Sequence, residues 1–235
     1  MRKFNIKIFA DGAKVDVMRK MNELDYVSGF TTNPSLLKQA GVTDYISFAK
    51  QIVKEFYPKP ISLEVINDSK EEMVKEARIL SALGQNVFVK IPVVNFKGET
   101  TYDIISKLSS EGIRLNITAV FTIKQVENIK KSLSPYTDNI ISIFAGRIAD
   151  TGRNASVIVK EAVEQCANMN NIEILWASCR EVFNIIEAEN SGCHIITITE
   201  DVMHKLKYLD KDMDEFSKET AKMFHDDAFA CGFVI

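Results

Sequence analysis

The sequence contains few of the residues that build disulfide frameworks or metal sites. It has four cysteines, widely scattered and without a CxxC pair: Cys166, Cys179, Cys193 and Cys231. This spacing predicts free thiols in the reducing environment of the cytoplasm. Its three histidines lie on different predicted elements with no carboxylate at ligand spacing, so we expect no metal.

Long apolar runs and an excess charge of one sign are also lacking. No run approaches the length of a membrane span, and the first residues pass from a basic start into a short strand pattern rather than a signal peptide. The formal net charge is −3 and the pI is about 5.7, which does not favour binding to nucleic acid or to an anionic membrane. The apolar fraction of 46% is enough to build a full core.

Short apolar runs alternate with amphipathic helical patterns along the chain. The predicted strands are Ile6–Ala10, Gly29–Thr32, Ile61–Val65, Val87–Ile91, Leu115–Val120, Ile140–Phe144, Ile174–Ala177 and Ile195–Thr199. The predicted helices are Lys14–Leu24, Pro34–Ala40 with Asp44–Tyr57, Lys70–Leu83, Thr101–Glu111, Ile123–Leu133, Ala155–Asn168 and Glu181–Ser191. Eight strands joined by crossover helices predict one (β/α)₈ TIM barrel domain over residues 1–235. The alternative, a doubly wound sheet, more often has fewer strands and a glycine-rich first turn, and this chain has no GxGxxG or Walker loop.

A charged tail follows the eighth predicted strand and forms a C-terminal helical extension over residues 201–235. Met213, Phe216, Thr220, Met223 and Phe224 recur at helical spacing within it. A barrel closed by eight units does not need this helix. It therefore docks either on a neighbouring subunit or on its own barrel, and the pattern does not separate the two.

Lys90 lies in the apolar stretch Val87–Ile91, which is typical of a buried strand in a parallel sheet. Burial disfavours a charged ammonium, and a neutral lysine amine is a nucleophile that forms Schiff bases with carbonyl compounds. The alternative is a structural lysine at an edge strand or paired with a carboxylate.

Polar side chains stand where nearly every predicted strand stops, and in a barrel the strand ends gather on one face. They are Asp11, Asn33, Glu64, Lys90, Asn116, Thr118, Ser142, Arg147, Ser178 and Arg180. Asp11 and Glu64 suit general acid–base catalysis, with Thr118 holding a water, and the two arginines with the two serines suit a phosphate ester. The asparagines suit substrate hydroxyls. The alternatives are an N-cap role for Asp11, an ion pair between Glu64 and Lys90, and surface ion pairs for the arginines.

These residues lie in segments that resemble the transaldolase family, in particular its small, barrel-only members. The matching segments are Phe-Ala-Asp-Gly-Ala at Asp11, Gly-Phe-Thr-Thr-Asn-Pro-Ser-Leu at Asn33, Ile-Ser-Leu-Glu-Val at Glu64, Val-Lys-Ile-Pro at Lys90, Asn-Ile-Thr-Ala-Val-Phe at Asn116, Ser-Ile-Phe-Ala-Gly-Arg at Arg147 and Ala-Ser-Cys-Arg at Arg180. They follow the family's order and cover nearly the whole chain. Gly12, Lys14, Ile143 and Ala149 depart from the family pattern, and none of them removes a catalytic group.

The resemblance implies a cofactor-free mechanism. Lys90 forms an iminium with the C2 ketone of a sugar phosphate, and Asp11 takes the C4 hydroxyl proton as the C3–C4 bond breaks. Glu64 and Thr118 position the water that shuttles protons. Arg147, Ser178 and Arg180 hold the phosphate, and Asn33 and Asn116 hold the dihydroxyacetone unit, with Ser142 and Phe144 also lining the substrate site.

Within this family, aldolase-type members have Gln where this chain has Glu64 and Tyr where it has Phe144. Because phenylalanine has no hydroxyl to protonate the enamine, the resemblance favours a cytoplasmic transaldolase. The rivals are a fructose-6-phosphate aldolase-like lyase, a related enzyme acting on an unusual sugar, and a non-catalytic phosphosugar-binding barrel. The resemblance further implies a homo-oligomer joined through the C-terminal helix, with a decamer as one candidate.

Overall fold

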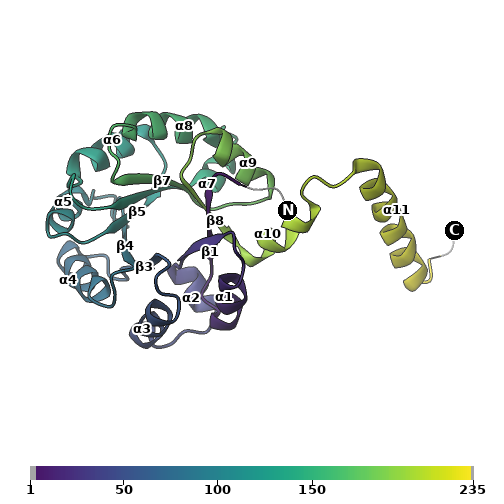
Figure 1. Cartoon of the computed structure of the whole chain (residues 1–235), viewed down its shortest axis with the longest axis horizontal. Helices are drawn as coiled ribbons and strands as arrows, with labels where there is room; N and C mark the ends of the chain where they lie inside the picture. Colours follow the sequence, from purple (N-terminus) through teal and green to yellow (C-terminus); the bar gives the residue numbers. More distant parts are fainter. Residues whose placement is uncertain (1–3, 234–235) are drawn as a thin grey trace.

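The computed structural model describes residues 4–233 and contains a closed barrel of eight parallel strands (Figure 1). The strands are β1 (Lys7–Asp11), β2 (Val27–Thr31), β3 (Ile61–Glu64), β4 (Val87–Pro92), β5 (Leu115–Val120), β6 (Asn139–Ile143), β7 (Ile172–Trp176) and β8 (Ile195–Thr199). Each strand pairs with the next along the chain, and β8 pairs with β1. The (β/α)₈ barrel predicted from the sequence is confirmed.

Helices surround the barrel, one or more after each strand (Figure 1). They are α1 (Val15–Asn22), α2 (Pro34–Gln39), α3 (Tyr45–Glu55), α4 (Lys70–Ser81), α5 (Tyr102–Ser110), α6 (Ile123–Ser132), α7 (Ala145–Ala149), α8 (Ala155–Cys166), α9 (Phe183–Asn190), α10 (Glu200–Lys205), the 3₁₀ helix η1 (Leu206–Tyr208) and α11 (Met213–Ala230). The predicted helices agree with these to within a few residues. The short helix α7 was not predicted, because a single turn and a half gives no periodic pattern.

Local sequence signals set several helix starts. Thr122 forms a capping box with Gln125 at α6, in which each side chain bonds the backbone N–H of the other residue. At α4 the cap is Ser69, whose hydroxyl accepts from Glu72 N. Such caps fix the point at which each helix starts at the barrel rim. They therefore also fix the position of the residues just before the helix.

The apolar core has two parts. The larger part fills the space between the strands and the helices, as expected for strands that are buried on both faces. The smaller part lies inside the barrel and includes Phe9, Phe88, Ile140, Leu175 and Ile195. Phe9 packs so closely on Gly29 that a Cβ there would lie 2.6 Å from the phenylalanine ring. This inner packing fills the barrel below the strand ends and leaves the polar residues at its mouth.

Strand pairing is uneven around the barrel. At the β2–β3 seam the paired residues within the described chain are Phe30 with Ile61 and Thr31 with Ser62. The β7–β8 seam is equally short, whereas β1–β8, β4–β5 and β6–β7 pair along most of the strand.

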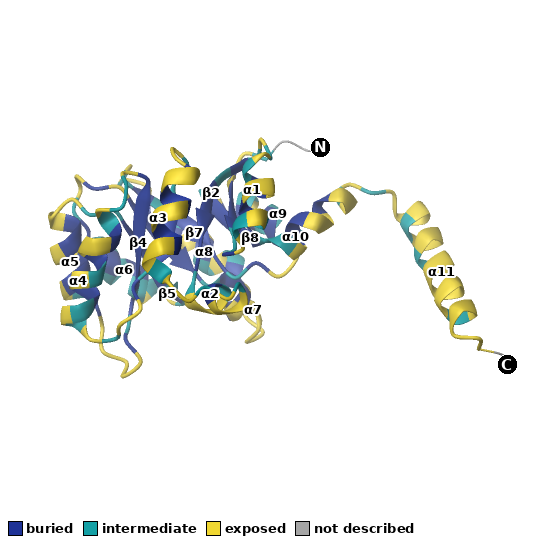
Figure 2. Cartoon of the chain, turned by 90° about the horizontal axis from the view of Figure 1, so that it is seen from below, coloured by how far each residue is buried: buried dark blue, intermediate teal, exposed yellow. Residues whose placement is uncertain are grey.

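The last helix, α11, extends away from the barrel beyond α10 and η1 (Figure 1). None of its residues is buried, and it is coloured largely as exposed in Figure 2. The predicted tail helix is thus interrupted, because Asp210 has a left-handed backbone (φ 58°) and Asp212 starts a new helix as its N-cap. Tyr208 stacks on Phe216 across this break, with the ring centroids 5.2 Å apart.

Candidate active site

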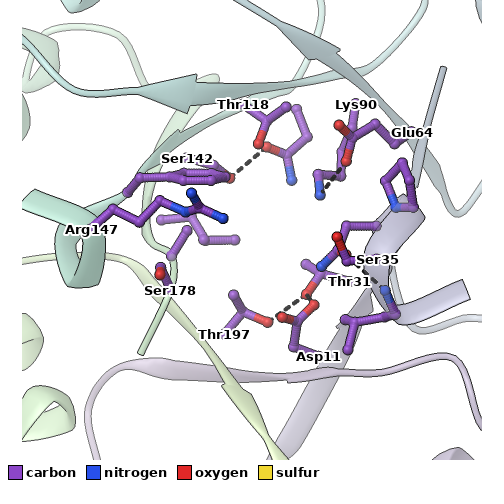
Figure 3. Close-up of a pocket in the computed structure, with 17 residues that line it drawn as sticks. Asp11, Thr31, Ser35, Glu64, Lys90, Thr118, Ser142, Arg147, Ser178 and Thr197 are labelled. Carbon is purple, nitrogen blue, oxygen red and sulfur yellow. Dashed lines mark hydrogen bonds and ion pairs between the residues drawn. The ribbon is translucent and has the colours of Figure 1, made fainter. Parts of the chain in front are cut away.

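A cavity of about 360 Å³ opens at the carboxyl ends of the strands, inside the barrel mouth. Its lining brings together ten of the eleven residues predicted from the sequence: Asp11, Asn33, Glu64, Lys90, Asn116, Thr118, Ser142, Phe144, Arg147 and Ser178. Six of them lie on the strands β1, β3, β4, β5 and β6, and the other four lie on the segments that follow β2, β6 and β7 (Figure 3). Convergence of this kind is typical of the active face of a TIM barrel.

Lys90 lies on β4 with only 6% of its surface exposed. Its Nζ donates to the backbone carbonyl of Thr32 at 2.8 Å and forms an ion pair with Glu64 Oε2 at 2.9 Å. Lys90 and Glu64 face each other because they are register partners on β4 and β3. The ion pair foreseen as the structural alternative is therefore present, in a cavity that is open to a ligand.

Asp11 ends β1 and faces the same cavity (Figure 3). Helix α1 starts after Lys14, so Asp11 is not its N-cap. Burial raises the pKa of Asp11 above the usual range, although the positive charge of Lys90 and a hydrogen bond from Thr31 oppose the shift. A carboxylate with a raised pKa exchanges protons more readily near neutral pH, which suits a general acid–base group.

A chain of amide and hydroxyl groups forms another part of the wall. Asn116 Nδ2 donates to Ser62 Oγ at 2.9 Å, and Ser142 Oγ donates to Asn116 Oδ1 at 2.6 Å. Asn33 caps α2 by accepting from Leu36 N at 3.0 Å, which leaves its amide Nδ2 for a ligand. These bonds fix the orientation of both asparagines before any substrate binds.

Thr118 contributes a buried hydroxyl that has no hydrogen-bond partner among the described residues. The next residue, Ala119, has a left-handed backbone (φ 56°), and the β5–β6 register shifts between Ile117 and Val120. A bulge of this kind re-aims a side chain at the end of a strand. A buried hydroxyl without a partner is costly, so it is ready to bond a ligand.

Arg147 supplies a positive charge at the cavity rim, with its guanidinium 5.9 Å from the centroid of the Phe144 ring. It makes no ion pair with any residue that the structure describes. Ser178 lies beside Arg147 on the segment after β7 and has a left-handed backbone (φ 63°) (Figure 3). An unpaired arginine beside a hydroxyl suits an anionic group such as a phosphate.

Arg180 is the one predicted site residue that does not line this cavity. Its Nη2 bonds Asp150 Oδ2 at 2.6 Å on the outer surface, and the side chain is about half exposed. The carboxylate draws the guanidinium away from the barrel mouth, so the surface ion pair foreseen as the alternative is the contact that forms. Burial also raises the pKa of the neighbouring Cys179 thiol to about 12, which leaves it protonated and unreactive at neutral pH.

Sequence reasoning missed several groups of the cavity. Thr31 and Thr197 lie beside Asp11, Ser35 lines the wall, and the carbonyl of Thr32 bonds Lys90. Thr197 stands between isoleucines in β8, and a polar residue inside a strand was the available signal.

No group of three or more His, Cys, Asp or Glu side chains is arranged to bind a metal ion in residues 4–233. Over the same residues, no helix is long and apolar enough to cross a membrane.

The family model for transaldolase/fructose-6-phosphate aldolase matches residues 8–233, a span that includes every lining residue described above. The chain belongs to this family. The resemblance noted in the sequence is therefore confirmed.

Relatives of this transaldolase-family enzyme have similar length. A "Probable transaldolase" of Clostridium botulinum (strain Langeland) is 36% identical over 230 residues, covering 93% of this chain and 98% of the relative. A "Probable transaldolase" of Methanococcus maripaludis (strain C7) is 37% identical over 202 residues, covering 86% and 89%.

Solved structures support the fold of the transaldolase-family chain. The 3-hexulose-6-phosphate synthase of Salmonella typhimurium superposes with a TM-score of 0.57 at 12% identity, covering 85% of this chain and 91% of that one. At this identity the likeness concerns the barrel alone.

Proposed function

We propose that this enzyme is a transaldolase that transfers a dihydroxyacetone unit between sugar phosphates through a Schiff base on Lys90. The observation that carries the proposal is a buried lysine at the base of a cavity that also holds two carboxylates and an unpaired arginine. The reaction would convert sedoheptulose 7-phosphate and glyceraldehyde 3-phosphate into erythrose 4-phosphate and fructose 6-phosphate, as in the non-oxidative pentose phosphate pathway.

The first half-reaction forms the covalent intermediate. Lys90 gives up a proton, attacks the C2 carbonyl carbon, and the carbinolamine loses water to leave an iminium. The 2.9 Å contact supports Glu64 as the group that receives the lysine proton. The unpartnered Thr118 hydroxyl supports a water that relays protons between Glu64 and the departing hydroxyl.

The second part breaks and remakes a carbon–carbon bond. Asp11 takes the C4 hydroxyl proton, the C3–C4 bond breaks, and its electron pair moves into the iminium to give an enamine. The aldehyde leaves, and the enamine adds to the carbonyl carbon of an incoming aldehyde phosphate. Asp11 then returns its proton to the new hydroxyl, and water releases the ketose from Lys90.

Phosphate binding is assigned to Arg147 and Ser178. Their positions at the cavity rim, away from Lys90, suit a substrate whose ketone is at one end and phosphate at the other. Arg180 remains a predicted phosphate ligand, and this role requires release from Asp150.

Transfer is favoured over aldol cleavage by Glu64 and Phe144. The Phe144 ring offers no proton to the enamine at this part of the wall. The intermediate then persists until an aldehyde acceptor arrives.

Product analysis tests the proposal directly. The protein is mixed with fructose 6-phosphate, with and without erythrose 4-phosphate. Sedoheptulose 7-phosphate that forms only with the acceptor supports a transaldolase, and free dihydroxyacetone without it supports an aldolase. The absence of both products rejects this substrate pair.

Borohydride trapping separates catalysis from binding alone. We expect a substrate-dependent mass increase on Lys90, and Lys90→Ala should lose the adduct and turnover while keeping its far-UV circular dichroism spectrum. The exposed-loop variant Lys97→Ala serves as the control for removal of a lysine. Turnover by Lys90→Ala at the wild-type rate would contradict the Schiff-base mechanism.

We also propose that the enzyme is a homo-oligomer joined through α11, with a decamer as one candidate. The absence of buried residues on α11 within the described chain supports this. A cytoplasmic location remains a prediction.

A further inference from the structure

Three side chains on neighbouring strands are connected next to Lys90. Thr31 Oγ1 on β2 donates to Asp11 Oδ1 on β1 at 2.7 Å, and the hydroxyl oxygens of Thr31 and Thr197 on β8 are 2.5 Å apart (Figure 3). We propose that Thr197 is a positioning residue that acts through Thr31 to hold the Asp11 carboxylate in its reactive orientation. The inference rests on the proposed function, in which Asp11 is the base.

The number of hydroxyl protons determines the donor and the acceptor in each of these two hydrogen bonds. An ionised carboxylate only accepts hydrogen bonds, so the single Thr31 hydroxyl proton is directed at Asp11. Thr31 then has no proton left for Thr197, and Thr197 must be the donor in the 2.5 Å contact. Both hydroxyl dipoles therefore point toward the carboxylate, and each polarises the next.

Strand pairing and burial make the chain rigid. Asp11 is the register partner of Thr31, and Thr197 pairs with Phe9 two residues earlier on β1. Both threonines are buried, and β-branched side chains have few rotamers. The bond from Thr31 occupies Oδ1, whereas Oδ2 accepts no hydrogen bond from the described residues and is free to meet a substrate hydroxyl.

The hydrogen bonds from Thr197 through Thr31 also favour the ionised form of Asp11, which burial disfavours. Lys90 and Glu64 act on this carboxylate across the cavity, and Lys14, Glu200 and Asp201 line an adjoining cavity that Asp11 also borders. Burial raises the pKa of Asp11, and the Thr31 hydrogen bond lowers it. A weaker bond from Thr31 would raise that pKa further. Because the base acts when ionised, the acid limb of kcat/KM would then move to higher pH.

Thr197→Val removes the hydroxyl and keeps the shape. We expect kcat to fall about three- to tenfold, the effect of losing one hydrogen bond, with KM unchanged within about twofold. The acid limb of kcat/KM should move to higher pH, and Thr197→Ser should restore both quantities. Thr197→Ala provides a second variant without the hydroxyl in case valine prevents folding.

Thr137→Val is the matched control. Thr137 is also a buried threonine whose hydroxyl is bonded, to Ser109 O, but it precedes β6 at the opposite end of the barrel. The Thr137→Val variant should be less stable than the wild type but should keep the wild-type pH profile of kcat/KM. An unchanged kcat and pH profile in Thr197→Val would overturn the proposal.

A measurement without turnover separates this inference from the proposed function. The ¹³Cγ resonance of Asp11, assigned with Asp11→Asn, reports its titration in each variant. We expect a higher midpoint in Thr197→Val than in the wild type and in Thr197→Ser. Equal midpoints would overturn the action of Thr197 on Asp11 even in an active enzyme, whereas a raised midpoint in a protein that turns over no sugar phosphate would support it and reject the transaldolase.

Discussion

Asp11 carries its charge in a part of the molecule where burial opposes it. Its folded-state pKa lies above the unfolded value, so the folded state binds the proton more tightly than the unfolded chain does. Stability therefore falls as the pH rises from the unfolded value, about 3.9, through the folded one. The proposed reaction requires ionised Asp11, whereas burial in the folded state disfavours this form.

Asp11→Asn should therefore raise the Tm at pH 7 while abolishing turnover. The asparagine Oδ1 still accepts from Thr31, and the buried charge is gone. Differential scanning calorimetry between pH 4 and pH 7 checks the expectation, because the gain should shrink toward the acid end. A Tm below that of the wild type at pH 7 would show that the charge stabilises the fold through Lys90.

Arg147→Ala should weaken the binding of phosphate esters. Loss of charge-assisted hydrogen bonds predicts a KM for fructose 6-phosphate raised by about ten- to a hundredfold, with a smaller change in kcat. Arg153→Ala, on the segment before α8, removes an exposed arginine whose Nη1 bonds Thr151 and should leave KM unchanged. Steady-state kinetics on both variants test this prediction. An unaltered KM in Arg147→Ala would show that the phosphate binds elsewhere.

The residues that sequence identified best are those fixed by a strand. Glu64 and Lys90 end up opposed because strand register sets their positions, and strand ends are recognisable in the sequence. Arg180 lies beyond its strand, so its direction depends on Asp150, which sequence does not connect to it. Thr31 and Thr197 were missed because threonine inside an apolar run is also an ordinary strand former.

At the scale of elements, the turn after β6 determines the phosphate end of the site. Gly146, in α7, approaches the segment after β7 so closely that an added Cβ would lie 1.7 Å from the Ser178 carbonyl oxygen. The close approach brings Ser178 and Arg147 to the same rim. Helix α7 was not predictable from the sequence, because five residues are too few to show a helical period.

Gly146→Ala should displace this turn. We expect a loss of about 1–3 kcal/mol in the free energy of unfolding from overpacking, together with a raised KM for phosphate esters. Gly12→Ala is the control, because a Cβ at Gly12 meets nothing within 4 Å. Urea unfolding and kinetics on both variants test this, and a stable Gly146→Ala with normal KM would refute it.

At the scale of the whole molecule, the barrel was predictable because eight strand patterns alternate with helical ones. The path of the tail was not predictable. The helical spacing was recognisable, but the break at Asp210 and the direction of α11 depend on local backbone and on the Tyr208–Phe216 stack.

Phe224→Asp should dissociate the proposed oligomer. Phe224 is 63% exposed on α11, and a charge there would be desolvated in an interface. Lys222→Glu changes charge on roughly the opposite side of the same helix and should leave the assembly intact. Light scattering after size exclusion gives the masses, and a monomeric wild type would reject the assembly.

The uneven pairing around the barrel divides it into two arcs. The short seams β2–β3 and β7–β8 separate β8–β1–β2 from β3–β7. The first arc carries Asp11 with both of its threonines, and the second carries Lys90 and Glu64. Transient opening of the barrel should therefore occur at these two seams. The arc that carries Asp11 would then move as one rigid body relative to the arc that carries Lys90. Hydrogen exchange faster at both seams than along β4–β5 would reveal this motion, and uniform exchange would exclude it.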